Sequence, residues 1–166
     1  YGVCPMGDST STTIASGSIF SGELGEALAS RELLGLVILW SRADPSRVGE
    51  VALFSDDGLT RILGRGDGSL GDGEERLQFY RQRPSGLEPR NPLEGSGLSR
   101  KQLELSVSDA QTVGIRSVGR AQLFVNGVRR DRGTVEPGDT VHIKNQLLLL
   151  CVKRPFRLQP LHSPLP

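Results

Sequence analysis

Three short polar motifs hold the side chains best suited to chemistry in this 166-residue chain. They are Gly64-Arg65, Leu98-Ser99-Arg100 and Val125-Asn126-Gly127. A guanidinium offers forked donors to a phosphomonoester dianion and a serine hydroxyl donates one more hydrogen bond, while an asparagine amide can fix the peptide backbone beside the phosphate. Since loops at one edge of a β-sandwich converge in space, we expect these motifs to assemble a phosphate site.

A second motif, G-x-G-x-x-G, spans residues 66–71 directly after an apolar run. A dinucleotide site would need the start of a helix here and a βαβ unit around it. The residues that follow, 72–83, are dense in charge, end at Arg83-Pro84 and lead back into strand-like sequence. We interpret the motif as a glycine-rich loop, and we expect no cofactor.

Histidine and cysteine are scarce, which limits metal binding and catalysis. The chain has only His142, His162, Cys4 and Cys151, and their scattered positions predict no metal site. No nucleophile, base and orienting group can be placed together, so we expect no enzymatic activity. Cys151 stands in an apolar run, where cysteine usually behaves as a buried hydrophobe, and we expect no disulfide with Cys4.

Charge is unevenly distributed along a chain whose net charge is +1. Residues 1–35 have four acidic residues and one arginine, a net charge of −3, whereas residues 76–101 have six basic and two acidic residues, a net charge of +4. The overall balance argues against a nucleic-acid binder, and few aromatic residues are available to stack on bases.

The apolar runs are too short for a membrane span. The longest, 33–40 and 147–152, fall far below the roughly 20 residues that cross a bilayer. No signal peptide is recognisable. We therefore expect no membrane contact and a cytoplasmic location.

The elements that must position the motifs are predicted to be short β-strands. Gly and Pro, with 21 and 10 residues, disfavour helix interiors. Apolar runs at 34–40, 48–54 and 59–63 are separated by turn residues, and residues 102–108 alternate with a period of two. Asn126-Gly127 is the dipeptide best suited to a two-residue hairpin. About ten such strands predict an all-β fold, a β-sandwich.

Composition divides the chain into three parts. Residues 1–32 are rich in Ser and Thr with few large apolar groups, which predicts a flexible arm. Residues 33–154 hold the predicted sandwich. Residues 155–166 include four prolines and are predicted to form a linker.

The same motifs, set in an all-β chain, resemble those of forkhead-associated (FHA) domains over about residues 34–154. FHA domains are phosphothreonine-binding modules with an eleven-stranded β-sandwich, so the resemblance implies that fold and that function. It implies that Arg65 and Ser99 bind the phosphate, that Arg100 adds a second cationic contact and that Asn126 hydrogen-bonds the ligand main chain. Gly64 and Gly127 would shape the loops in the same way as in the family.

Two departures from the family pattern concern the site. Gln102 stands where the family has a histidine, which is an architectural hydrogen-bonding residue of the loop and for which an amide can substitute. The segment from Arg65 to Ser99 is also longer than usual, and the extra length falls in a stretch rich in Gly and Pro. This segment can cover, extend or obstruct the site.

Residues 75–84, 98–103 and 145–151 resemble the N-terminal FHA domains of bacterial, particularly myxobacterial, sigma-54-dependent transcriptional activators. The resemblance implies a sensory or regulatory module of such an activator. It also implies as partners a Thr-phosphorylated protein or peptide and an upstream Ser/Thr kinase. The chain's own arm is a candidate ligand through Thr10, Thr12 and Thr13. The alternative is a scaffold or dimerisation sandwich with a degenerate phosphate site.

Overall fold

A computed structural model describes residues 31–158. Nearly all of the predicted arm, with Cys4 and the three threonines Thr10, Thr12 and Thr13, lies outside the described residues. So does most of the predicted linker, from residue 159 onward. Within residues 31–158 no helix is long and apolar enough to span a bilayer.

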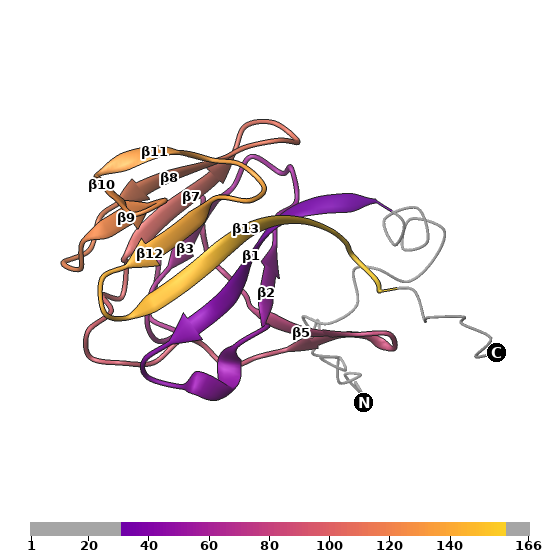
Figure 1. The fold of residues 1–166 in the computed structure, drawn as a ribbon, viewed down its shortest axis with the longest axis horizontal. Helices are drawn as coiled ribbons and strands as arrows, with labels where there is room; N and C mark the ends of the chain where they lie inside the picture. The colour runs from indigo at the N-terminus through magenta and orange to yellow at the C-terminus, as the bar shows by residue number, and fades with distance from the viewer. Residues whose placement is uncertain (1–30, 159–166) are drawn as a thin grey trace, which may run out of the picture.

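Two stacked sheets form a β-sandwich, as the sequence predicts (Figure 1). The larger sheet has the order β10 (Val128–Arg130), β9 (Leu123–Val125), β12 (Thr140–Ile143), β13 (Leu147–Pro155), β1 (Glu32–Ser41), β2 (Val51–Leu53), β5 (Tyr80–Arg83), β6 (Gly86–Pro89). The smaller sheet has the order β11 (Arg132–Val135), β8 (Val113–Ser117), β7 (Leu103–Val107), β3 (Thr60–Leu63), β4 (Glu74–Arg76). All strand pairs are antiparallel except β3 with β4.

The core lies between the sheets and is built from alternating positions of their strands. Leu36 and Ile38 of β1 are fully buried beside Leu147 and Leu149 of β13. The facing layer comes from β7 and β8, and it contributes Leu103, Leu105, Val113 and Ile115. Period-two alternation in the sequence therefore reports burial on one face of each sheet.

Cys151 belongs to this core and is a free, buried cysteine. Burial raises the pKa of its thiol to about 11, because a thiolate is poorly solvated among apolar side chains. The thiol is therefore protonated and unreactive near neutral pH.

The predicted strand 48–54 is shorter in the structure. Pro45–Arg47 form a short 3-10 helix, and Gly49 has a φ of 88°, so only Val51–Leu53 pair as a strand. Gly49 N–H donates to the Ile38 carbonyl over 2.8 Å. The chain turns here because Glu50 is directed inward, where it is fully buried.

Glu50 anchors the long segment between Arg65 and Ser99 to the sandwich. Its carboxylate accepts from Arg47 Nε over 2.7 Å and from Arg90 Nε over 3.0 Å. Arg47 in turn donates through Nη1 to the Pro92 carbonyl over 3.1 Å. The segment is thus fixed at Arg90 and Pro92, and its Phe79 is buried in the core.

This segment extends both sheets. It supplies β4 to the edge of the smaller sheet and the β5–β6 hairpin to the edge of the larger one. No helix follows residues 66–71, as expected for a glycine-rich loop rather than a dinucleotide site. The sandwich has thirteen strands rather than about eleven, three of them from this segment.

Candidate functional site

The end of β3 packs directly against the loop that holds Ser99. A Cβ placed on Gly64 would lie 2.0 Å from the Arg100 carbonyl oxygen and 2.7 Å from that of Ser99, so only glycine fits. Arg65 N–H donates to the Ser99 carbonyl over 3.1 Å, and Gln102 N–H donates to the Leu63 carbonyl over 2.9 Å. Two of the three predicted motifs are therefore brought together by backbone contact.

Gln102 ties the Ser99 loop to the loop between β8 and β9. The side chain is fully buried, its Oε1 accepts from Ser99 N–H over 3.3 Å, and its Nε2 donates to the Ala121 carbonyl over 2.8 Å. Its backbone carbonyl accepts from Val118 and Gly119 over 3.0 and 3.1 Å. Gln102 therefore holds residues 98–102 and 118–121 together.

Ser99 presents a hydroxyl whose proton is free to be donated. Its Oγ accepts from Arg120 N–H over 3.0 Å, which fixes the side chain. Within residues 31–158 the hydroxyl donates to no protein acceptor. A serine hydroxyl held by one accepted bond can donate its proton to an anionic ligand.

Both predicted arginines of the site lack acidic partners. Arg65 Nε is buried and has no hydrogen-bond partner among the described residues. The Arg65 backbone pairs with Leu93 in an isolated parallel bridge, and Gly66 N–H donates to the Leu93 carbonyl over 2.8 Å. Arg100 is exposed on the adjoining loop and forms no ion pair in the described part of the chain.

Arg76 is a site residue that sequence reasoning missed. It stands on β4, and its guanidinium donates to the Arg100 carbonyl over 2.5 Å and to the Gly68 carbonyl over 3.2 Å. Burial lowers the pKa of Arg76, although Asp67 and Glu74 nearby oppose this effect. Arg76 thus links the 66–70 loop to the Ser99 loop. Its place depends on the parallel pairing of β4 with β3, which no local pattern reveals.

Lys101 and Glu74 make a second link between the same two segments. Lys101 Nζ lies 2.5 Å from Glu74 Oε2, and this hydrogen bond is the main reason that the pKa of Glu74 is lowered. Glu74 also accepts from Gly71 N–H over 2.7 Å. The long segment therefore buttresses one side of the candidate site.

Asn126 stands in the turn between β9 and β10. As predicted, Asn126-Gly127 form a two-residue hairpin, with φ values of 49° and 77° between the paired residues Val125 and Val128. The hairpin is at the far end of β9, roughly 16 Å along the chain from Ala121 at about 3.3 Å per residue.

The Asn126 side chain ties the hairpin to the start of β12. Its Nδ2 donates to Asp139 Oδ1 over 2.7 Å, and its Oδ1 accepts from Thr140 N–H over 2.8 Å. The bond from Asn126 is the main reason that the pKa of Asp139 is lowered. Within residues 31–158 no hydrogen bond joins Asn126 or Gly127 to Arg65 or Ser99, and their part in the site stays a prediction. The loop of residues 118–121 contacts Ser99 through the Arg120 N–H.

Replacing Asn126 with alanine is expected to lower the free energy of unfolding by about 1 kcal/mol without changing phosphopeptide affinity. The reason is that its amide bonds to Asp139 and Thr140, and Ser99 is not among its partners. Urea unfolding and a peptide titration of the same variant measure the two effects. A marked loss of affinity at unchanged stability would contradict this prediction and would show that Asn126 takes part in binding.

Among residues 31–158 no group of three or more His, Cys, Asp or Glu side chains is placed to hold a metal ion. Arg65, Ser99 and Arg100 hold donors that no acceptor within this part of the chain uses. Such a set can bind an anion.

Neither a protein-family model nor a curated protein sequence matches the chain. Several solved FHA-domain structures match its fold. The FHA domain of the CT664 protein from Chlamydia trachomatis is 17% identical with a TM-score of 0.50, and the match covers 72% of this chain and 96% of that one. This likeness establishes that residues 31–158 adopt an FHA-like β-sandwich.

Two further solved structures are similar at slightly lower scores. The FHA domain of a hypothetical protein from Arabidopsis thaliana is 17% identical with a TM-score of 0.49, over 81% of this chain and 93% of that one. The yeast Dun1 FHA domain, solved with a doubly phosphorylated peptide derived from Rad53, is 14% identical with a TM-score of 0.49, over 80% and 82%.

Proposed function

We propose that this chain is a phosphothreonine-peptide binding module. The observation that carries the proposal is the convergence of three loops, residues 64–66, 98–102 and 118–121, on two unpaired arginines and a free serine hydroxyl. The glycine contact at Gly64 and the buried amide of Gln102 hold these loops in fixed positions. The motifs that resemble FHA domains fall on the first two of these loops.

Each group has a distinct role in the proposal. Arg65 supplies forked donors to the phosphate dianion, Ser99 donates its hydroxyl proton to a phosphate oxygen, and Arg100 adds a second positive charge. Arg76 holds the Arg100 backbone in place and is a positioning residue. The peptide main chain is assigned to the loop 118–121, in place of Asn126, because that loop lies against Ser99.

An oriented peptide library tests the proposal. The 166-residue chain is immobilised and exposed to matched pools with phosphothreonine, phosphoserine or unmodified threonine at the fixed position. We expect retention of the phosphothreonine pool, weaker retention of phosphoserine because it lacks the methyl group, and none of threonine. Retention of no phosphorylated pool, together with self-association of the chain, would support the scaffold or dimerisation function instead.

Two finer assignments extend the proposal. The module acts in the cytoplasm as the sensory domain of a sigma-54-dependent activator, downstream of a Ser/Thr kinase, as the resemblance of residues 75–84, 98–103 and 145–151 suggests. Co-purification of the full-length protein with sigma-54 RNA polymerase tests this assignment. If the polymerase does not co-purify while peptide binding is intact, only the assignment to a sigma-54-dependent activator fails.

The chain's own phosphorylated arm is a second proposed ligand, because Thr10, Thr12 and Thr13 are tethered to the site at high effective concentration. The peptide selected from the library should then bind more weakly to arm-phosphorylated protein than to unmodified protein. Isothermal titration of both forms measures the difference. Equal affinities would exclude binding in cis.

A further inference from the structure

Four arginines beside the candidate site have no acidic partner. We call them the basic corner; they are Arg120, Arg129, Arg130 and Arg132. All four are exposed, and none forms an ion pair within the described residues. Six of the other thirteen arginines in residues 31–158 form ion pairs: Arg47, Arg61, Arg81, Arg83, Arg90 and Arg116. The basic corner therefore gathers four unpaired arginines within thirteen residues of the chain.

Hydrogen bonds connect the basic corner to the candidate site. Arg120 N–H donates to Ser99 Oγ, so Arg120 belongs to the site's third loop. The turn between β10 and β11 lies against the end of β8, where Ser117 N–H donates to the Asp131 carbonyl over 2.8 Å. Residue 118 follows directly and begins that third loop. Figure 1 shows β8, β9, β10 and β11 gathered at one side of the sandwich.

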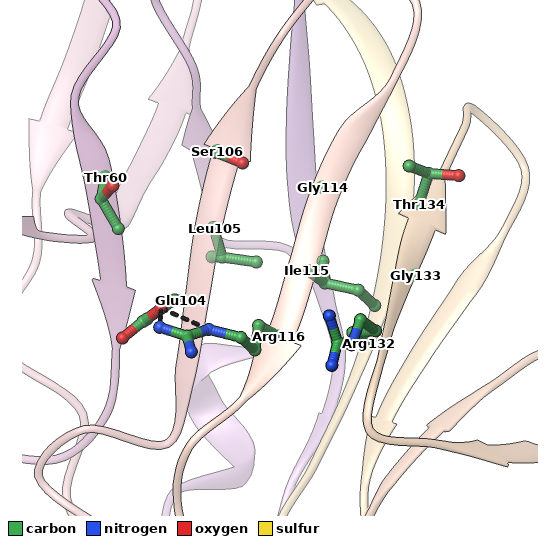
Figure 2. Close-up of a pocket in the computed structure, with 10 residues that line it drawn as sticks. All are labelled: Thr60, Glu104, Leu105, Ser106, Gly114, Ile115, Arg116, Arg132, Gly133 and Thr134. Carbon is green, nitrogen blue, oxygen red and sulfur yellow. Dashed lines mark hydrogen bonds and ion pairs between the residues drawn. The ribbon is translucent and has the colours of Figure 1, made fainter.

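On the outer face of the smaller sheet, one carboxylate lies near two neighbouring arginines and pairs with only one of them. Arg116 is on β8, where it lies opposite Glu104 of β7 on one side and opposite Arg132 of β11 on the other. Arg116 Nε donates to Glu104 Oε2 over 2.8 Å, and Figure 2 shows Arg116 turned toward Glu104 with Arg132 beside it and unbonded. Glu104 is thus used by Arg116, and Arg132 is left unneutralised.

The outer face beside Arg132 is also hollowed. A depression of about 440 Å³ lies on this face, and Gly114, Gly133 and Thr134, labelled in Figure 2, are among the residues that line it. A Cβ on Gly133 would meet no atom within 4 Å, so the surface is open at that residue. A peptide side chain leaving the Ser99 loop in this direction would find room and polar contacts.

The net charge of the basic corner favours an acidic ligand. Four arginines stand against one acidic residue, Asp131, which is exposed and forms no ion pair among the described residues. Like charges that lie close together repel, and an anionic segment placed over them removes that repulsion. Phe124 lies opposite Arg129, and its ring packs on His142. The net charge of only +1 and the small number of aromatic side chains in the chain favour a peptide over a nucleic acid.

We propose that the basic corner binds acidic residues that flank the phosphothreonine, so that the partner is an acidic phosphopeptide segment. This inference rests on the proposed phosphothreonine function and names the chemical class of its ligand. Exposed arginines act chiefly on the association rate and on the choice of partner, and their effect weakens as salt screens it.

Two phosphothreonine peptide pools test the inference. They share a degenerate core around the phosphothreonine and differ only in having Glu or Gln at the flanking positions. By fluorescence anisotropy at low salt, the full chain should bind the Glu pool about fivefold more tightly. In a variant with both Arg130→Ala and Arg132→Ala, the two pools should bind equally.

The matched control also removes two positive charges, but at the C-terminal end of β13. It combines Lys153→Ala with Arg154→Ala. These residues pair with the start of β1, away from Ser99, so the fivefold preference should remain. The inference would be overturned if the parent and the variant with Arg130→Ala and Arg132→Ala preferred the Glu pool to the same degree. It would also be overturned if the variant lost affinity for both pools equally. Displacement of the Glu pool by an oligonucleotide at matched phosphate concentration would overturn it as well.

The outcomes separate this inference from the proposed function. If the affinity for both pools is the same with and without phosphorylation of the threonine, the proposed function fails. If both pools bind only when phosphorylated but show no preference for Glu, the site stands and only the role of the basic corner fails.

Discussion

Replacing Arg65 with alanine is expected to weaken binding of the library-selected phosphothreonine peptide at least about tenfold. A charge-assisted hydrogen bond contributes about 1.5–3 kcal/mol, and about 1.4 kcal/mol corresponds to a factor of ten in affinity. Arg65 is expected to show this effect because its backbone is fixed to the Ser99 loop while its Nε has no partner among the described residues. Isothermal titration of parent and variant measures the change.

Two control variants isolate the phosphate contact. Arg65→Lys keeps the charge but removes the forked donors, so an intermediate affinity is expected. Arg154→Ala removes an arginine near the end of β13 that pairs with Leu33, and its affinity should equal that of the parent. If Arg65→Ala binds the peptide as tightly as the parent does, the proposed pocket is wrong.

Replacing Gln102 with alanine is expected to lower the free energy of unfolding by about 2–4 kcal/mol and to abolish most peptide binding. The substitution leaves the Ser99 N–H and the carbonyl of the half-buried Ala121 without their side-chain partner, and it opens a cavity in a fully buried position. Both losses act on the loops that surround the site. Urea unfolding measures the stability, and peptide titration measures the binding.

Gln102→His provides the rescue experiment for this position. A histidine ring has one nitrogen to donate toward Ala121 and one to accept from Ser99, so stability and binding should be largely retained. Gln78→Ala is the matched control, because the exposed Gln78 amide also bonds two carbonyls, at distances of 2.7 and 2.6 Å. Equal destabilisation by Gln78→Ala and Gln102→Ala would contradict the assigned role of Gln102.

Much of the sandwich is predictable because its strands have local signatures. Residues 102–108 alternate in the sequence, and β7 buries Leu103 and Leu105 as that alternation implies. Asn126-Gly127 predicts the hairpin because few residues other than Asn and Gly adopt positive φ at both positions. The strand expected at 48–54 is shorter than its apolar pattern indicates, since the burial of the charged Glu50 depends on Arg90, far along the chain.

The site is only partly predictable, because sequence order does not tell at which end of a strand a residue lies. Gly64 and Ser99 meet through pairing of β3 with β7, and both carry recognisable motifs. The third loop, residues 118–121, has no distinctive motif, and its place beside Ser99 depends on the buried amide of Gln102. Asn126 is the more conspicuous residue in the sequence, yet its side chain bonds to Asp139 and Thr140 rather than to Ser99.

An NMR titration of the isotopically labelled chain with the library-selected phosphothreonine peptide tests the central claim most directly. Saturable changes in amide chemical shift are predicted to be largest at Arg65, Arg100 and Arg120 and small at Asn126. The unphosphorylated peptide should cause none. Shifts that stay below detection, that occur equally with the unphosphorylated peptide, or that are centred on the hairpin at Asn126 would contradict a phosphothreonine site at the Ser99 loop.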